Sequence, residues 1–139
     1  ARDVAANHAR LALAARARGE RVLLMSGGEL TVTLTGNGTG GRNQEYALAL
    51  AIHLNGAAGI TAIAAGTDGA DGGTGAADDP AGGLIDETTL PRAQALNLNS
   101  ATFLENNDSG GFFDRLGDLV VTGPTQTNVN DFRAILVEP

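Results

Sequence analysis

Apolar residues recur at helical spacing at the start of the chain. Over residues 3–18, Val4, Leu11 and Ala15 fall on one stripe of a helix, and arginines occupy other positions. Alanine, leucine and arginine favour helix, and Gly19 is a residue typical of a helix end. The pattern predicts an opening helix with a structural role.

Two strand-like runs follow. Residues 21–25 predict a short buried strand, and residues 26–28 predict a turn. From Leu30 to Leu34, apolar residues alternate with threonines, which is typical of a strand with one buried face. The apolar side of this second strand should therefore point one way and its threonines the other.

A long apolar segment comes after a glycine-rich loop. Residues 43–54 are so apolar, apart from their first turn and His53, that they predict a buried helix packed on a sheet. Residues 60–65 form another short apolar run, which predicts a strand. Short strands alternating with helices indicate an α/β layered fold that binds ligands at strand carboxyl ends.

The second half of the chain carries weaker patterns. Residues 66–83 are rich in glycine and aspartate and contain Pro80, so we expect a mobile loop such as a lid or binding loop. The other expected elements are helices over residues 84–98 and 109–116 and strands over residues 119–122 and 132–137.

Length and composition favour one domain. The chain has 139 residues, enough to bury a core, and 42% of them are hydrophobic, which excludes the composition of a disordered chain. We expect a single α/β domain over residues 1–139, with a mixed sheet flanked by helices and ligand loops at strand carboxyl ends.

Charge and residue usage exclude several partners. The net charge is -7 and the nine basic residues are scattered, which argues against nucleic-acid binding. All nine are arginine, so this segment holds no Schiff-base or P-loop lysine, and the absence of cysteine excludes disulfides and thiolate chemistry. No apolar run reaches about eighteen residues, so we expect no membrane partner and a cytoplasmic location.

The most informative segment is the glycine-rich loop over residues 36–45, which runs into the predicted buried helix. Glycines let main-chain N–H groups approach a ligand closely, and a helix N-terminus adds unpaired donors and about half a positive charge. Arg42 adds a full charge at the same place. The sequence therefore predicts an anion site at this helix start.

Other interpretations of this loop stay open. The spacing of Gly36, Gly38 and Gly41 matches the dinucleotide fingerprint, with Asp68 as a ribose acceptor, but a six-stranded dinucleotide fold fits poorly in the remaining length. A Walker A match fails because Arg and Asn stand where Lys and Ser or Thr belong. The plain alternative is a tight turn with a helix cap.

Two aspartates are candidate magnesium ligands. Asp68 and Asp71 lie three residues apart in a glycine-rich loop, so both carboxylates could face one Mg²⁺ ion or a substrate hydroxyl. A solvated acidic turn is the ordinary alternative. The incomplete ligand spacing excludes an EF-hand.

Two more polar segments can form hydrogen bonds, although neither offers a strong nucleophile. One covers residues 122–131, where a plain β-turn would need fewer polar groups, and the other covers residues 106–109, where a helix cap is the ordinary explanation. His8 and His53 occupy ordinary positions on predicted helices.

Five segments, in order along the chain, resemble the MOFRL domain. This is the C-terminal domain of a class of glycerate kinases that is also called TtuD-like or hydroxypyruvate reductase. The resemblance covers nearly the whole chain, and the segments that carry it are residues 26–32, 36–45, 66–72, 106–109 and 116–131. One departure lies at residues 73–86, which are longer and richer in aspartate than the usual family pattern.

The resemblance implies a two-domain enzyme. An upstream α/β domain, absent here, and this domain would enclose a cleft in which phosphate passes from ATP to D-glycerate, with Mg²⁺, to give 2-phosphoglycerate. The family arginine, here Arg42, is thought to serve the substrate carboxylate or the transferring phosphate. The other residues implied to bind substrate or nucleotide are Gly38, Gly40, Gly41, Asn43, Glu45, Asp68, Asp71, Asn107, Asp108, Thr125, Thr127, Asn128 and Asn130.

These expectations agree with the chemistry of phosphoryl transfer, which depends on positioning and charge neutralisation. Arg42 is the expected catalytic residue, and Asp68 or Asp71 would hold Mg²⁺ or orient hydroxyls. Asn43 and Glu45 would hold the loop in place through hydrogen bonds rather than contact the ligand. No general base is identifiable, and the upstream domain would supply it.

Three hypotheses from different classes remain. The first is the glycerate 2-kinase, the second an NAD(P)H-dependent hydroxypyruvate reductase, and the third a regulatory or assembly module without activity. We expect no turnover from this fragment alone, because half a cleft cannot position both reactants. A homodimer is one open oligomeric state.

Overall fold

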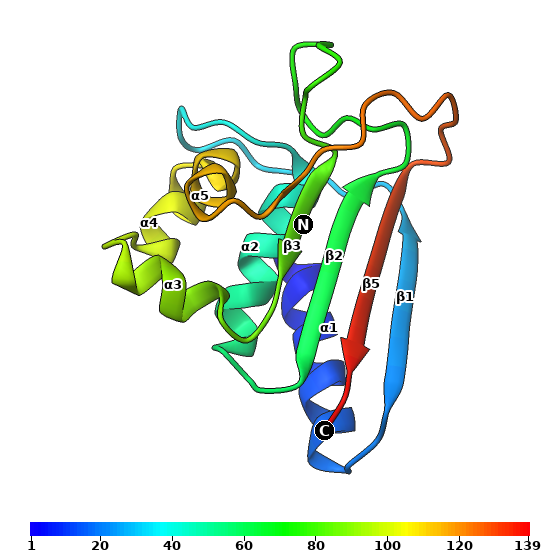
Figure 1. Cartoon of the computed structure of the whole chain (residues 1–139), viewed down its shortest axis with the longest axis vertical. Helices are drawn as coiled ribbons and strands as arrows, with labels where there is room; N and C mark the ends of the chain where they lie inside the picture. Colours follow the sequence, from blue (N-terminus) through cyan, green and yellow to red (C-terminus); the bar gives the residue numbers. More distant parts are fainter.

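A five-stranded sheet runs through the molecule, and helices lie behind it and along one side (Figure 1). The computed structural model describes residues 1–139. The elements in chain order are α1 (Arg2–Ala17), β1 (Val22–Gly28), α2 (Arg42–Leu54), β2 (Ile60–Gly66), β3 (Gly82–Ile85), α3 (Thr89–Ala95), α4 (Ser100–Glu105), α5 (Ser109–Leu116), β4 (Leu119–Val120) and β5 (Asp131–Val137).

The strand order is β1-β5-β2-β3-β4, and every neighbouring pair is antiparallel. The α/β class is confirmed, whereas the sheet is antiparallel rather than mixed. The reason is that β5, the last strand in the chain, inserts between β1 and β2 and runs against both. Local sequence patterns carry no signal for such an insertion.

The elements with strong periodicity are confirmed. The opening helix is α1, the apolar segment after the glycine loop is α2, and the runs at residues 60–65 and 132–137 are β2 and β5. The helix expected at residues 109–116 is α5, and β4 covers part of the predicted strand at residues 119–122.

The predicted strand from Leu30 to Leu34 is wrong. This segment joins no ladder, and its Leu30 N–H donates instead to the side chain of Asp131. The predicted turn at residues 26–28 is also wrong. These residues are the end of β1 and pair with the start of β5.

The glycine-rich region over residues 66–83 ends in a strand that the sequence did not suggest. β3 opens with two glycines, and a Cβ atom on Gly82 would overlap the Ala64 carbonyl of β2. The helix expected over residues 84–98 is therefore shortened to α3. A further helix, α4, was not predicted, although Asn99 caps it by accepting from the Thr102 N–H at 3.1 Å.

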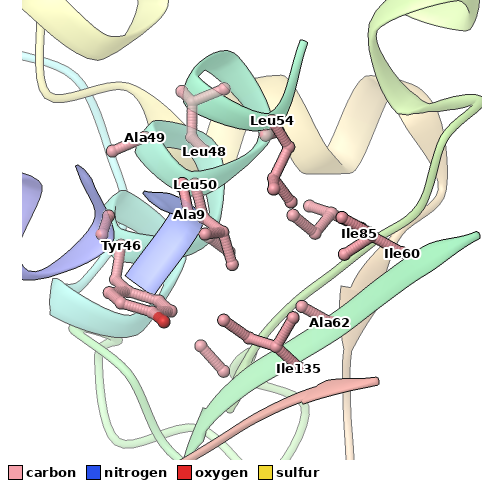
Figure 2. Close-up of a cluster of buried hydrophobic side chains, with 14 of the residues drawn as sticks. Ala9, Tyr46, Leu48, Ala49, Leu50, Leu54, Ile60, Ala62, Ile85 and Ile135 are labelled. Carbon is pink, nitrogen blue, oxygen red and sulfur yellow. The ribbon is translucent and has the colours of Figure 1, made fainter. Parts of the chain in front are cut away.

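The core forms around α2. Nearly all of its residues are buried, and Figure 2 shows Tyr46, Leu50 and Leu54 among apolar side chains from α1 and the sheet. Small residues such as Ala5 and Ala9 let α1 pack closely on α2. This packing fixes the N-terminus of α2 at the loop end of the sheet.

The opposite face of the sheet carries exposed apolar residues. Leu23 and Met25 of β1 are 56% and 64% exposed, and their neighbour Phe132 of β5 is 38% exposed. None of the helices is both long and apolar enough to cross a membrane.

Candidate functional site

Three loops leave the sheet at the same edge. Gly28 at the end of β1 and Gly66 at the end of β2 both pair with Asp131 at the start of β5. The loop after β1, the loop after β2 and the loop before β5 therefore meet there, beside the N-terminus of α2 (Figure 1). Loops therefore lie at the carboxyl ends of β1 and β2, where the sequence predicted them.

The start of α2 is already occupied by a carboxylate of the protein. Asp71 accepts the main-chain N–H groups of Asn43 at 3.0 Å and Gln44 at 2.8 Å, and the side chains of both residues also donate to it. Asp71 is 4% exposed. Burial raises the pKa of Asp71, and the hydrogen bonds from Asn43 and Gln44 oppose that rise.

The prediction that a ligand anion binds these N–H groups at the start of α2 is therefore wrong, because the Asp71 carboxylate already accepts them. A negative group stabilises a helix N-terminus, and here the protein supplies it internally. An anion bound at this edge must therefore find other donors.

Close approach explains two of the loop glycines. A Cβ atom on Gly41 would overlap the backbone and carboxyl group of Asp71. Gly72 has φ +72, and a Cβ atom there would lie 2.8 Å from the Cα atom of Gly41. The glycines thus let the two loops touch through their backbones.

Arg42 is anchored by the buried carboxylate of Asp131. Its Nε donates to both Asp131 oxygens, at 3.0 and 2.9 Å, and the Asp131 side chain is 0% exposed. Burial alone would raise the pKa of Asp131, but hydrogen bonds from Arg42 and Asn43 and the positive charge of Arg42 hold it below its usual value. Asp131 is therefore a buried, ionised anchor.

Arg42 also lines a hollow of about 490 Å³. The hollow is lined by the backbones of both glycine loops, by Asp68 and Asp71, and by an apolar wall of Leu30, Val32 and Leu34. The Arg42 side chain is 35% exposed, and its Nη1 donates to Glu29 at 3.1 Å. A cation, a carboxylate and an apolar wall thus share one open site.

Asp68 and Asp71 both line this hollow but differ in what they can do. Asp68 is exposed, accepts from the Ala70 N–H at 3.1 Å and lies 3.4 Å from the Asn128 amide nitrogen. The hydrogen bonds to Asp71 already occupy both of its oxygens. No group of three or more His, Cys, Asp or Glu side chains is arranged to hold a metal.

Of the two carboxylates that line the hollow, only Asp68 is available to bind Mg²⁺. Mg²⁺ commonly keeps several waters and binds through one or two carboxylates together with substrate phosphates. Asp68 is the carboxylate free to take part, whereas Asp71 is committed to α2.

The polar residues before β5 mostly bind the loop after β2. Thr67 Oγ1 donates to the Asn130 carbonyl at 2.7 Å, and Thr125 Oγ1 donates to the carbonyls of Thr67 and Thr127. Asn128 contacts Asp68. None of these four candidates, Thr125, Thr127, Asn128 and Asn130, lines the hollow. They brace Asp68 and its loop from the outside.

The outer half of the glycine loop is attached to the residues between α4 and α5. Gly38 N–H donates to the Asn106 carbonyl at 2.9 Å, and Thr39 N–H donates to Asp108 at 3.0 Å. Asn107 accepts from Gly36 N–H at 2.9 Å and donates to Glu45 at 2.9 Å. These candidate residues hold the loop in place, and they do not line the hollow either.

Sequence reasoning missed three groups at the site. Asp131 and Glu29 both contact Arg42, and the 30–34 segment forms the apolar wall. An aspartate at the first position of a buried strand is a signal that could have identified Asp131. No local pattern indicates Glu29, because its role depends only on where Arg42 lies.

Known proteins share this architecture. A glycerate kinase structure from Thermotoga maritima superposes with a TM-score of 0.90 and 40% identity, covering 98% of this chain and 33% of that one. The D-glycerate 2-kinase of Thermotoga maritima is 48% identical over 78% of this chain and 25% of its own length. A protein from Agrobacterium vitis with a provisional hydroxypyruvate reductase name is 46% identical over 99% of this chain and 32% of its own length.

The chain therefore spans about a third of the length of such relatives. The MOFRL family model matches residues 22–131, which include the glycine loop, α2 and the first residue of β5. On this match and these identities, the chain belongs to the MOFRL family.

Proposed function

We propose that this domain forms one wall of the active-site cleft of an ATP-dependent D-glycerate 2-kinase. The observation that carries the proposal is Arg42, which a buried carboxylate anchors at Nε and which lines a hollow together with Asp68. The glycerate kinase names of relatives supply the reaction class. The full reaction would convert D-glycerate and ATP to 2-phosphoglycerate and ADP.

Arg42 has the chemistry that the reaction needs. A guanidinium can bind a carboxylate or phosphate through two parallel hydrogen bonds and stays charged at any physiological pH. Because its Nε is held by Asp131, the group does not have to reorganise when charge develops on the substrate, which is the basis of electrostatic catalysis. Arg42 would thus bind the glycerate carboxylate or neutralise the transferring phosphoryl group.

Asp68 and the glycine backbones would complete this wall. ATP supplies the phosphoryl group, and Mg²⁺ neutralises its oxygens when bound. Asp68 would hold Mg²⁺ directly or through water, or orient the glycerate hydroxyls. The glycine backbones at residues 40–41 and 72–73 leave space for a ligand to come close, since no side chain projects from them.

The other wall would come from an upstream domain of the same enzyme. Of the two carboxylates that line the hollow, Asp71 is held by the N–H groups of α2, so the role of general base falls to Asp68 or to the other wall. The isolated 139 residues should therefore show no turnover, because positioning both reactants needs both walls.

The reductase alternative loses support from the structure. A dinucleotide fingerprint requires a strand directly before the glycine loop, within a βαβ unit of parallel strands. Here residues 30–34 form no strand, and all neighbouring strands of the sheet are antiparallel. The Agrobacterium vitis name keeps the reductase as the alternative to test.

Two assays on the full-length enzyme separate the candidates. One follows ADP release with D-glycerate and Mg-ATP, and ³¹P NMR identifies which hydroxyl carries the phosphate. The other follows NADH absorbance with hydroxypyruvate. We expect ADP release with 2-phosphoglycerate as product and no NADH oxidation. NADH oxidation without phosphorylation would overturn the proposal.

A further inference from the structure

Arg42 is paired with two carboxylates in contrasting environments. Asp131 is 0% exposed and takes both of its contacts from Nε, at 3.0 and 2.9 Å. Glu29 is 61% exposed and makes a single contact to Nη1, at 3.1 Å. The two partners of one guanidinium therefore hold it with different strength.

The Asp131 contact is buried and supported by several other donors. Besides Arg42, this carboxylate accepts from the Asn43 side chain at 2.9 Å and from the Leu30 N–H at 3.3 Å, and Arg133 lies 3.5 Å away. Removing a buried carboxylate from these donors would leave them unpaired. Asp131 thus fixes the direction in which the outer edge of Arg42 points.

The Glu29 contact is easily exchanged. An exposed ion pair with one hydrogen bond contributes little, because water competes with both partners. Nη2 of Arg42 makes no hydrogen bond to the protein, so Glu29 uses only half of the outer edge. A carboxylate or phosphate that contacted both Nη1 and Nη2 would bind better than Glu29 does.

We propose that Glu29 occupies the place of the substrate's anionic group at Arg42 and is displaced when that group binds. This inference rests on the proposed function, and it assigns Glu29 a role in setting substrate affinity. The ligand class is an oxygen anion, either the glycerate carboxylate or a nucleotide phosphate. Because Glu29 competes with it, removing the Glu29 charge should tighten binding.

The test compares Glu29→Gln with the wild type in the full-length enzyme. We expect KM to fall about two- to five-fold for the one substrate whose anionic group binds Arg42, the range expected from the strength of an exposed pair. A fall in KM for D-glycerate identifies the carboxylate, and a fall for ATP identifies a phosphate. Glu20→Gln is the matched control, because it breaks the exposed 2.7 Å pair with Arg18 far from the hollow and should leave both KM values unchanged.

Calorimetry keeps the inference separate from the proposed function. Titrations of full-length wild type and Glu29→Gln with D-glycerate and with Mg-ATP need no turnover, and Glu29→Ala repeats the comparison if the first variant folds poorly. An enzyme that binds but does not phosphorylate glycerate would refute the proposed function while the affinities still test Glu29. Unchanged or weaker binding of both ligands in the Glu29 variants would overturn the inference.

Discussion

Asp71 and Asp68 belong to the same glycine loop, three residues apart, yet they lie in two different regions. Asp71 belongs to a buried network that also contains Asp131, Asn43 and Gln44. Asp68 lies on the open rim of the hollow, and its carboxylate contacts only its own loop and Asn128. The comparison shows that burial, rather than residue type, separates the scaffold of this site from the groups that can meet a ligand.

Removing the deepest carboxylate should have the largest effect on stability. Asp131→Ala leaves Arg133, itself 3% exposed, and Arg42 without their shared carboxylate. Breaking a buried ion pair costs about 3 kcal/mol or more. Urea unfolding should show this loss for Asp131→Ala and less than about 0.5 kcal/mol for Asp68→Ala on the rim. Equal losses in the two variants would contradict the division into network and rim.

The contact between the two glycine loops gives the next effect. In Gly41→Ala the new methyl group would overlap Asp71, and overpacking of this kind costs about 1–3 kcal/mol. Gly27→Ala is the matched control, because its Cβ atom would meet only the Asp131 carbonyl at 3.4 Å, an ordinary contact. Thermal unfolding compares the two. If Gly41→Ala were as stable as Gly27→Ala, the loops would not be packed as described.

A subtler pair of variants separates stability from activity. Asp71→Asn turns one acceptor oxygen into a donor that faces the N–H groups of α2, so unfolding free energy should fall by about 1–2 kcal/mol. Asp68→Asn should leave stability almost unchanged and lower kcat of the full-length enzyme. Unfolding curves and kinetics measured on the same samples check this, and full activity in Asp68→Asn would remove Asp68 from the site.

The smallest effect is a difference in pH dependence within the buried network. The pKa of Asp131 is lowered below 3.8, so its stabilisation is present above that pH and is lost as pH falls through the folded-state pKa. The pKa of Asp71 is raised above 3.8, so its contribution is present below that pH and declines as pH rises through the folded-state pKa. Relative to the wild type, Asp131→Asn should reduce the acid loss of stability, and Asp71→Asn should increase it. Parallel pH curves for both variants would refute these signs.

The sequence identified the elements whose signal is local. α1 and α2 follow from helical periodicity, and β2 and β5 follow from short apolar runs. The 30–34 segment shows where local patterns fail. Its alternation is typical of a strand, but its Leu30 N–H donates to the distant Asp131 side chain, and its apolar residues line the hollow. The position of β5 inside the sheet could not be predicted, because pairing of distant strands leaves no local pattern.

As with the fold, the parts of the candidate site that have a local signal could be predicted, and those that depend on distant contacts could not. The glycine loop, Arg42 and Asp68 were identified by residue type and spacing, and the structure places them on one hollow. The role of Asp71 at the start of α2 depends on a contact with Asn43, which lies 28 positions away in the sequence. The role of Asp131 depends on its contact with Arg42, which lies 89 positions away. Only the folded chain brings these groups together.

The proposed role of Arg42 is to supply a positive charge to the reacting anion. Its most direct test is ATP-dependent phosphorylation of D-glycerate by full-length enzyme carrying Arg42→Ala, with Arg18→Ala as the control because Arg18 lies away from the hollow. We predict that kcat/KM falls by a factor equivalent to about 2–4 kcal/mol in Arg42→Ala and stays at the wild-type value in Arg18→Ala. Near-normal turnover by a folded Arg42→Ala enzyme would contradict the account.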